Sequence, residues 1–267
     1  MIRDRVISGV CVALLLIAAV LWLPPLWSAA ALSLVLLLAA WEWAGFVAPG
    51  RGPARLLFVA ACAALCALWW MVSRDGSLRV VLWSAFAFWA LAATVIFTSP
   101  ARVGRLLVAG SGLLALSFAW LALVHMRIEW PQGGRAVMYA LLIVWVADSG
   151  AYFAGRAWGN RKLAPQVSPG KTWAGLWGGV AACALLAAAS AMLWQLPLLP
   201  LLIVTMAVGL FSVVGDLTES LCKRFAGVKD SGSLIPGHGG VLDRFDSLLA
   251  AAPLLMLGIE LLPGLRG

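Results

Sequence analysis

The chain has 267 residues, of which 63% are hydrophobic and 11% are charged, and its mean hydropathy is +0.99. A soluble domain is about half apolar and about a quarter charged, so this composition excludes a water-soluble enzyme. It also excludes a disordered chain and a disulfide-stapled secreted module. The composition predicts a protein that crosses a membrane several times.

The net charge is +8, from 19 Lys and Arg residues against 11 Asp and Glu residues. In a soluble protein such an excess would indicate a nucleic-acid ligand. Here the basic residues lie in short segments between apolar runs, so we expect no nucleic acid and interpret the charge as an orientation signal in a lipid bilayer. The five cysteines form no CxxC pair or zinc-ligand set, and we interpret them as structural.

Long apolar runs follow one another along the whole chain, without the alternation of a membrane barrel. A helix needs about 20 residues to cross a bilayer core of about 30 Å. The first run follows two arginines and resembles a secretory signal peptide, but it exceeds the usual signal core of about 7–15 residues, so we favour a retained helix. The sequence predicts an all-α polytopic membrane protein with about nine transmembrane helices, at residues 6–23, 26–47, 55–72, 80–97, 106–124, 136–153, 173–194, 201–215 and 248–262.

We divide the chain into residues 1–135, with about five N-terminal transmembrane helices, and residues 136–267, a catalytic membrane region with long loops at 154–172 and 216–247. Nine crossings place the two termini on opposite sides of the membrane. Fourteen of the 19 Lys and Arg residues fall on the side of the N-terminus, so the N-terminus and both long loops are predicted to be cytoplasmic. We expect any chemistry in these loops and in the helix ends beside them.

The loop at 216–247 carries five of the eleven acidic residues, although charge is costly at a membrane. We expect the eighth helix to continue past the bilayer to about Phe225. Asp216 and Ser220 then share one face of that helix. Glu219 pairs with Lys223 on the adjoining face.

We expect the ninth helix to begin near Val241, which puts Asp243 and Asp246 on one face of its first turns. Converging carboxylates from the last two helices suit Mg²⁺, a hard cation that prefers oxygen ligands. Mg²⁺ together with basic residues is typical of phosphoryl or nucleotidyl transfer. A surface loop whose charges pair with each other is the plainer alternative, but the density of charge at the bilayer edge favours a site. The basic residues among these acids are Lys223, Arg224, Lys229 and Arg244.

A glycine-rich turn at 236–240 connects the two helices. The backbone N–H groups of Gly239 and Gly240 can approach an anion closely, because these residues have no side chain. His238 beside them either hydrogen-bonds a phosphate or base or only braces the turn, and both interpretations stay open.

A second polar stretch begins inside the sixth apolar run with Asp148, and an intramembrane carboxylate is a functional candidate by default. The structural alternatives are a helix–helix hydrogen bond or an ion pair with Arg156. The segment from Ser168 to Thr172 resembles the end of a phosphate-binding P-loop, but the required first glycine is Pro165 and we expect no strand before it. Lys171 can still hold a phosphate as a point charge.

The motif from Ser220 to Asp246, with Lys-Asp-Ser-Gly and Pro-Gly-His-Gly-Gly at its centre, resembles the signature of the phosphatidate cytidylyltransferases, the CDP-diacylglycerol synthases. The segments that begin at Asp148 and at Ser168 resemble the same family. The resemblance covers about residues 140–250. One departure is Ala174, where we expect many relatives to carry a polar or acidic residue.

The resemblance implies a Mg²⁺-dependent reaction of CTP with phosphatidic acid that yields CDP-diacylglycerol and pyrophosphate, with a second metal ion left open. It suggests Asp216 and Asp243 as metal ligands, and we add Asp246. As catalytic groups we add Lys223 and Arg224, which we expect to bind phosphates of CTP or of the lipid. The candidate substrate-binding residues are Asp148, Arg156, Ser168, Lys171, Ser220, Lys229, His238, Gly239, Gly240 and Arg244.

The expected location is the bacterial plasma (inner) membrane, with the bilayer as a partner and a homodimer left open. The nearest alternative function is a CTP-dependent lipid kinase that acts on a polyprenol or phytol-like alcohol. A second alternative is an ion transporter. A transporter would explain the intramembrane acids but not the Lys-Asp-Ser-Gly and His-Gly-Gly segments.

Overall fold

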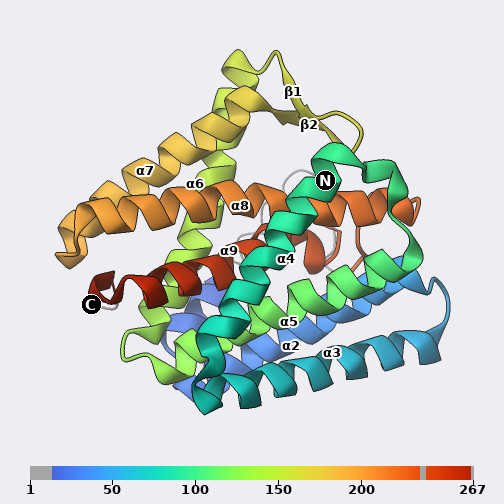
Figure 1. Ribbon diagram of the computed structural model, residues 1–267, viewed down its shortest axis with the longest axis horizontal. Helices are drawn as coiled ribbons and strands as arrows, with labels where there is room; N and C mark the ends of the chain where they lie inside the picture. The colour runs from blue at the N-terminus through green and yellow to red at the C-terminus, as the bar shows by residue number, and fades with distance from the viewer. Residues whose placement is uncertain (1–13, 235–238, 266–267) are drawn as a thin grey trace.

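A computed structural model describes residues 14–234 and 239–265 of the chain, and these residues are mostly helical (Figure 1). Residues 14–21 are helical. This helix ends before Pro25, because proline lacks the N–H group that a continuous helix would need at Pro24 and Pro25. The rest of the predicted first run, and Cys11 within it, lies outside the described residues. Eight long helices follow: α2 (Pro25–Val47), α3 (Gly52–Val72), α4 (Leu78–Thr98), α5 (Arg105–Glu129), α6 (Gly133–Trp158), α7 (Trp173–Trp194), α8 (Leu198–Phe225) and α9 (Leu242–Leu261).

Six stretches of the described residues are long and apolar enough to cross a membrane. One of them, Gly52–Thr98, contains both α3 and α4, which are separated by a tight turn at Ser73–Ser77. Gly76 in this turn has φ +84°, a left-handed conformation that glycine adopts readily. The helix α9 is not among the six stretches. The helices support a polytopic membrane protein, and the number of nine crossings stays a prediction.

The described residues are nearly all helical, as the all-α prediction expects, apart from one short β hairpin. The long loop that we predicted at 154–172 contains two antiparallel strands, β1 (Lys162–Ala164) and β2 (Ser168–Thr172), at the free end of α6 and α7 (Figure 1). The statement that no strand precedes Lys171 is therefore wrong. The hairpin begins four residues after α6 ends at Trp158, and Thr172 at its other end caps α7 by accepting a hydrogen bond from Gly175 N–H.

Glycines allow α6 and α7 to pack closely along their length. A Cβ atom on Gly179 would lie 2.8 Å from the carbonyl oxygen of Ala147 in α6. A Cβ atom on Gly175 would lie 3.0 Å from the carbonyl oxygen of Ala151. Small residues permit this approach of two helix backbones in a membrane protein. The close packing holds the hairpin and the polar end of α6 in a fixed relation.

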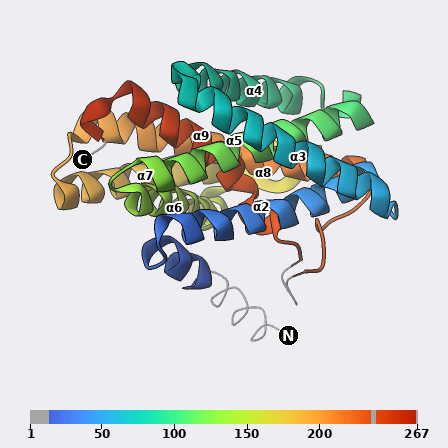
Figure 2. The same ribbon diagram turned by 90° about the horizontal axis from the view of Figure 1, so that it is seen from below.

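The helix α9 lies at the centre of the bundle, and Ala250, Ala251, Leu255 and Met256 are fully buried. In Figure 2, α9 passes between other helices, and residues 226–234, which follow α8, lie next to α2. The four cysteines in the described residues are free and buried, which agrees with a structural role.

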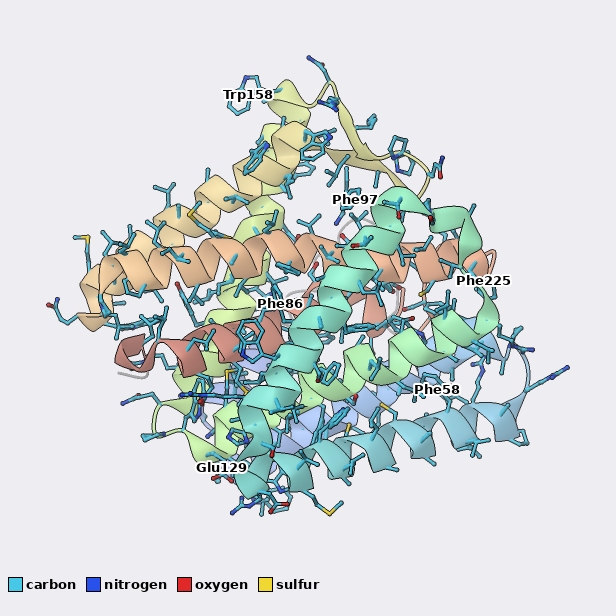
Figure 3. All side chains as sticks on the ribbon, viewed as in Figure 1. Phe58, Phe86, Phe97, Glu129, Trp158 and Phe225 are labelled. Atoms are coloured by element: carbon cyan, nitrogen blue, oxygen red, sulfur yellow. The ribbon has the colours of Figure 1, made fainter. Side chains whose placement is uncertain are left out.

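The loops gather at two ends of the bundle. At one end, Arg105 donates a hydrogen bond to the carbonyl oxygen of Val47. At the other end, Arg74 forms an ion pair of 2.6 Å with Glu129. Figure 3 shows the same division, because Phe97, Trp158 and Phe225 lie along the upper and right edges, while Glu129 lies at the lower left. The two long polar segments are therefore at one end, as the alternation of helices predicts.

Candidate active site

One face of the last turns of α8 carries a row of polar side chains, and the helix extends to Phe225 as predicted. Ser220 Oγ donates a hydrogen bond of 3.2 Å to Asp216 Oδ1. Lys223 Nζ lies 2.6 Å from Glu219 Oε2. Both pairs have the i, i+4 spacing that the sequence predicts.

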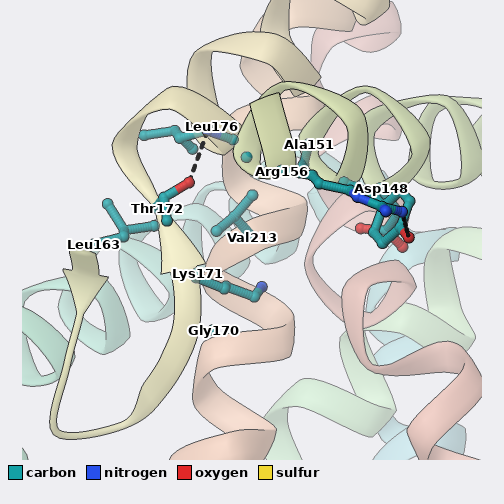
Figure 4. A pocket seen from close by; sticks show the side chains of 12 residues that line it. Asp148, Ala151, Arg156, Leu163, Gly170, Lys171, Thr172, Leu176 and Val213 are labelled. Atoms are coloured by element: carbon teal, nitrogen blue, oxygen red, sulfur yellow. Dashed lines mark hydrogen bonds between the residues drawn. The ribbon is translucent and has the colours of Figure 1, made fainter. Parts of the chain in front are cut away.

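A lysine of the β hairpin lies next to this row. Lys171 Nζ in β2 lies 2.6 Å from Asp216 Oδ2, and the two side chains are 22% and 27% exposed. Lys171 also lines a cavity of about 390 Å³ between the hairpin, α6, α7 and α8, and Asp148 lies across this cavity on α6 (Figure 4). Asp148 interacts electrostatically with both Lys171 and Asp216. The structure thus brings together three of the predicted residues from three separate elements.

A glycine contact brings α9 against the same part of α8. A Cβ atom on Gly215 would lie 2.5 Å from the carbonyl oxygen of Asp246, so a larger residue would push the two helices apart. Asp246 lies in the first turns of α9, just before the apolar part of that helix. Burial, together with the negative charges of Asp216 and Glu219, raises its pKa well above the ordinary value. Asp216 and Asp246 are therefore members of one electrostatic cluster.

Lys223 lies deeper than Lys171 and connects two carboxylates. Its Nζ atom is 2.6 Å from Glu219 Oε2 and 2.7 Å from Asp243 Oδ1. The side chain of Lys223 is 13% exposed, that of Asp243 is 8% exposed, and that of Glu219 is fully buried. Lys223 thus connects a carboxylate of α8 to one of α9, and removal of one member would leave buried charge without its partner.

Asp243 accepts hydrogen bonds from the segment that precedes α9, by which we mean residues 229–234 and 239–241. Its Oδ2 atom accepts hydrogen bonds from Ser231 N–H at 2.9 Å, from Ser231 Oγ at 2.9 Å and from Gly240 N–H at 2.8 Å. Gly239 has φ +82°, and a Cβ atom there would lie 2.8 Å from the same oxygen. Burial alone would raise the pKa of Asp243, but the hydrogen bonds from Lys223 and from the two backbone N–H groups hold it below the ordinary value. The Asp243 carboxylate is already surrounded by donors from the chain.

A residue that we did not predict completes this segment. Glu42 in α2 is 4% exposed, and it accepts hydrogen bonds from the backbone N–H groups of Val241 at 3.0 Å and Leu242 at 2.8 Å. Ser231 Oγ lies 3.0 Å from Glu42 Oε2. The available signal was a glutamate inside an apolar run, the same signal that singled out Asp148. Its partners, almost 200 positions away in the sequence, could not be inferred from spacing.

The remaining predicted residues lie around this cluster or apart from it. Arg156 lines the cavity of Lys171, and it hydrogen-bonds the Tyr152 hydroxyl at 3.2 Å rather than pairing with Asp148. Arg224 lines a different cavity, of about 380 Å³, and lies 3.5 Å from the carbonyl oxygen of Val167. Ser168 begins β2, Lys229 and Arg244 are exposed, and His238 lies outside the described residues.

The cluster offers carboxylate oxygens, the ligands that a hard cation prefers. In residues 14–234 and 239–265, however, no three His, Cys, Asp or Glu side chains form a group that could hold a metal ion. Asp216 and Asp246 interact with each other and with Lys171. The Lys171 ammonium group holds the position next to Asp216 that a cation would take. Asp243 fits a ligand role less well, because the chain already donates to both of its oxygens.

Sequence comparisons lead to the same chemistry. The chain matches the cytidylyltransferase family over residues 3–262. It is 40% identical over 261 residues to the phosphatidate cytidylyltransferase of Pseudomonas aeruginosa, and the similarity covers 95% of each chain. It is 36% identical over 281 residues to the phosphatidate cytidylyltransferase of Haemophilus influenzae, which covers 95% of this chain and 96% of that one. A stretch of 121 residues, 45% of each chain, is 47% identical to the phosphatidate cytidylyltransferase of Bacillus subtilis. The chain therefore belongs to the cytidylyltransferase family, as its two polar motifs indicate.

Proposed function

We propose that this protein transfers the CMP group of CTP to phosphatidic acid and releases pyrophosphate. In this reaction an oxygen of the lipid phosphate forms a bond to the α-phosphorus of CTP, and the bond from that phosphorus to the oxygen bridging it to the β-phosphate breaks. The lipid phosphate is largely ionised near neutral pH, so the attack needs no strong base. The enzyme has to bring two anions together and stabilise the leaving pyrophosphate.

The observation that carries the proposal is Lys171, which lines a cavity at the end of the apolar helices and forms an ion pair with Asp216 beside that cavity. A partly exposed lysine can exchange its carboxylate partner for a phosphate without unfolding any element. The cavity is lined by polar residues of α6 and β2 and by Leu163, Leu176 and Val213. Such a mixed lining suits a charged headgroup that stays attached to a membrane lipid. The similarity to two named phosphatidate cytidylyltransferases over 95% of this chain supports the same activity.

We assign Lys171 to a phosphate group of CTP or of the lipid, and Asp216 to the orientation of Lys171. Ser220 supports Asp216 through its hydrogen bond. Lys223, which we predicted as a phosphate ligand, is already paired with two carboxylates, so we now assign it to the junction of α8 and α9. Arg156 is the second basic group of the cavity.

We assign Mg²⁺ to Asp216 and Asp246, whose carboxylates lie in one cluster with more negative than positive charge. Bound there, the ion would neutralise the charge of the triphosphate and of the departing pyrophosphate. Asp243 would then act through the backbone that it holds in place. The plasma-membrane location, the cytoplasmic orientation and a homodimer stay predictions.

The test uses purified protein in detergent with phosphatidic acid, Mg²⁺ and CTP labelled on either the α- or the γ-phosphate. Label from the α-phosphate in the lipid product, with release of pyrophosphate, supports the proposal. In a parallel assay with a polyprenol as the acceptor, transfer of label from the γ-phosphate would instead identify a lipid kinase. Ion flux through protein-containing liposomes without nucleotide would identify a transporter. A chelator control measures the metal dependence.

A further inference from the structure

We infer that Glu42 is a positioning residue for the reaction: from α2, its carboxylate holds the segment before α9 and the start of α9 in the active arrangement. The inference rests on the proposed function for its effect on turnover. Its geometric basis is independent of which substrates the protein uses. Glu42 touches neither the cavity nor Lys171, so we do not assign it to the reacting groups.

The first argument is the missing local cap of α9. The first backbone N–H groups of a helix have no partner within the helix, and a nearby side chain usually accepts from them. The helix α9 has no such cap from its own N-cap residue Val241. Glu42 takes this role, because its two carboxylate oxygens accept from the N–H groups of Val241 and Leu242. A negative charge at this end of a helix is also favourable.

The second argument is the connection to Asp243. Ser231 Oγ lies 3.0 Å from Glu42 Oε2 and 2.9 Å from Asp243 Oδ2. A serine hydroxyl has one hydrogen, so it donates to one carboxylate at a time and links the two. Asp243 in turn holds Lys223 and the Gly240 N–H group. Glu42 is thus the outer member of a chain of contacts that reaches the polar face of α8.

The third argument is the fit of the backbone around the carboxylate. A Cβ atom on Gly232 would lie 2.5 Å from Glu42 Oε1, and a Cβ atom on Gly240 would lie 2.3 Å from Oε2. Both glycines therefore let the segment before α9 close over Glu42. Two glycines, two backbone donors and one hydroxyl surround a single buried side chain. This arrangement specifies an acceptor at both oxygens, not merely a side chain of the right volume.

The experiment compares Glu42→Gln and Glu42→Asp with the wild-type protein in the CMP-transfer assay. Gln keeps the shape of Glu but replaces one acceptor by an NH₂ donor that faces a backbone donor. We expect Glu42→Gln to lower kcat at least tenfold while the KM for CTP changes less than twofold. Asp keeps both acceptors on a shorter stem, and we expect it to retain more activity than Gln. If Glu42 only filled space, Gln would be the better-tolerated variant, and that order would overturn the inference.

The matched control is Glu260→Gln, which changes a buried glutamate at the other end of α9. We expect its kcat to stay within twofold of the wild type. Ser231→Ala removes the link between the two carboxylates and leaves the N–H contacts of Glu42, so we expect a smaller decrease of about two- to fivefold, as for one lost hydrogen bond. Equal kcat values for Glu42→Gln and Glu260→Gln would contradict the positioning role.

A second measurement does not depend on activity. Limited trypsin digestion in detergent, followed by mass spectrometry, reports cleavage after the exposed Lys229 in the segment before α9. We expect Glu42→Gln to accelerate this cleavage at least fivefold, while cleavage after the exposed Lys162 in the hairpin keeps its rate. An unchanged rate at Lys229 would overturn the inference. If the wild-type protein transferred no CMP, the proposed function would fail, and the digestion would still decide whether Glu42 holds this segment.

Discussion

The ammonium group of Lys171 and the carboxylate of Asp216 lie 2.6 Å apart, and they join the β hairpin to the eighth helix beside the cavity that Lys171 lines. The two residues are 45 positions apart in the sequence. The ion pair keeps a cationic group at the cavity before any substrate binds.

The first prediction concerns Lys171→Ala. A hydrogen bond between charged groups contributes about 1.5–3 kcal/mol, so we expect the KM for CTP to increase by about ten- to a hundredfold, with a smaller change for the lipid. Initial rates over a range of CTP concentrations measure this. Lys162→Ala, in the exposed start of the same hairpin, is the matched control and should leave the KM unchanged. An unaltered CTP dependence in Lys171→Ala would show that Lys171 does not bind a phosphate of CTP.

The second prediction separates three aspartates that look alike in the sequence. Asp216→Asn and Asp246→Asn should reduce turnover by at least a hundredfold and change the thermal midpoint little, because the cluster has an excess of negative charge. Asp243→Asn should lower the thermal midpoint as well. The Asp243 carboxylate accepts from four donor groups, and one of them is the ammonium group of the buried Lys223. Activity and thermal unfolding in detergent measure both effects. A stable, inactive Asp243→Asn protein would instead favour our original assignment of Asp243 as a metal ligand.

The third prediction concerns metal removal. Chelation should abolish CMP transfer, and added Mg²⁺ should restore it. Mg²⁺ should also raise the thermal midpoint of the wild-type protein without substrates, since binding to the native state alone stabilises it. Asp216→Asn should lose this shift, whereas Glu129→Gln, at the opposite end of the bundle, should keep it. An equal Mg²⁺ shift in both variants would argue against the site at Asp216.

The fourth prediction concerns Gly215→Ala. The added methyl group would lie 2.5 Å from the carbonyl oxygen of Asp246, so α8 and α9 must separate. Such overpacking costs about 1–3 kcal/mol, and we expect a lower thermal midpoint and at least a tenfold loss of activity. Gly110→Ala in α5 is the control, because a Cβ atom there meets nothing within 4 Å. In Gly110→Ala, helix propensity should leave stability equal or raise it by up to about 1 kcal/mol. Similar effects of both substitutions would contradict this account.

The sequence alone predicts the features that depend on local spacing. The end of α8 at Phe225 and the Glu219–Lys223 pair follow from the helical repeat. The break at Pro24 follows from the missing N–H group of proline and its fixed φ. The spacing of Gly175 and Gly179 is of the small-residue type that favours close helix packing, although it does not identify α6 as the partner.

The features that depend on tertiary contacts were not predictable in this way. The strands of the hairpin have three and five residues, too short for an alternating pattern, and β2 contains Pro169 and Gly170. The role of Glu42 depends on backbone groups from a distant segment. The donors around Asp243 are likewise backbone N–H groups, and a residue type does not reveal where those will point. The helical repeat identifies which side chains share a face. It does not identify which of them already have all their hydrogen-bond partners within the protein.

The anchoring of the segment before α9 on α2 limits how this protein can be divided. A fragment that begins at residue 136 would contain every residue of the cavity wall and yet lack the acceptor for the start of its last helix. A chimera with the first helices of an unrelated membrane protein would need a carboxylate at the position along the helix, and on the helix face, that Glu42 occupies in α2. The N-terminal helices are thus structural components of the catalytic half, and their exchange between such proteins is expected to succeed only when the donor supplies a carboxylate placed like that of Glu42.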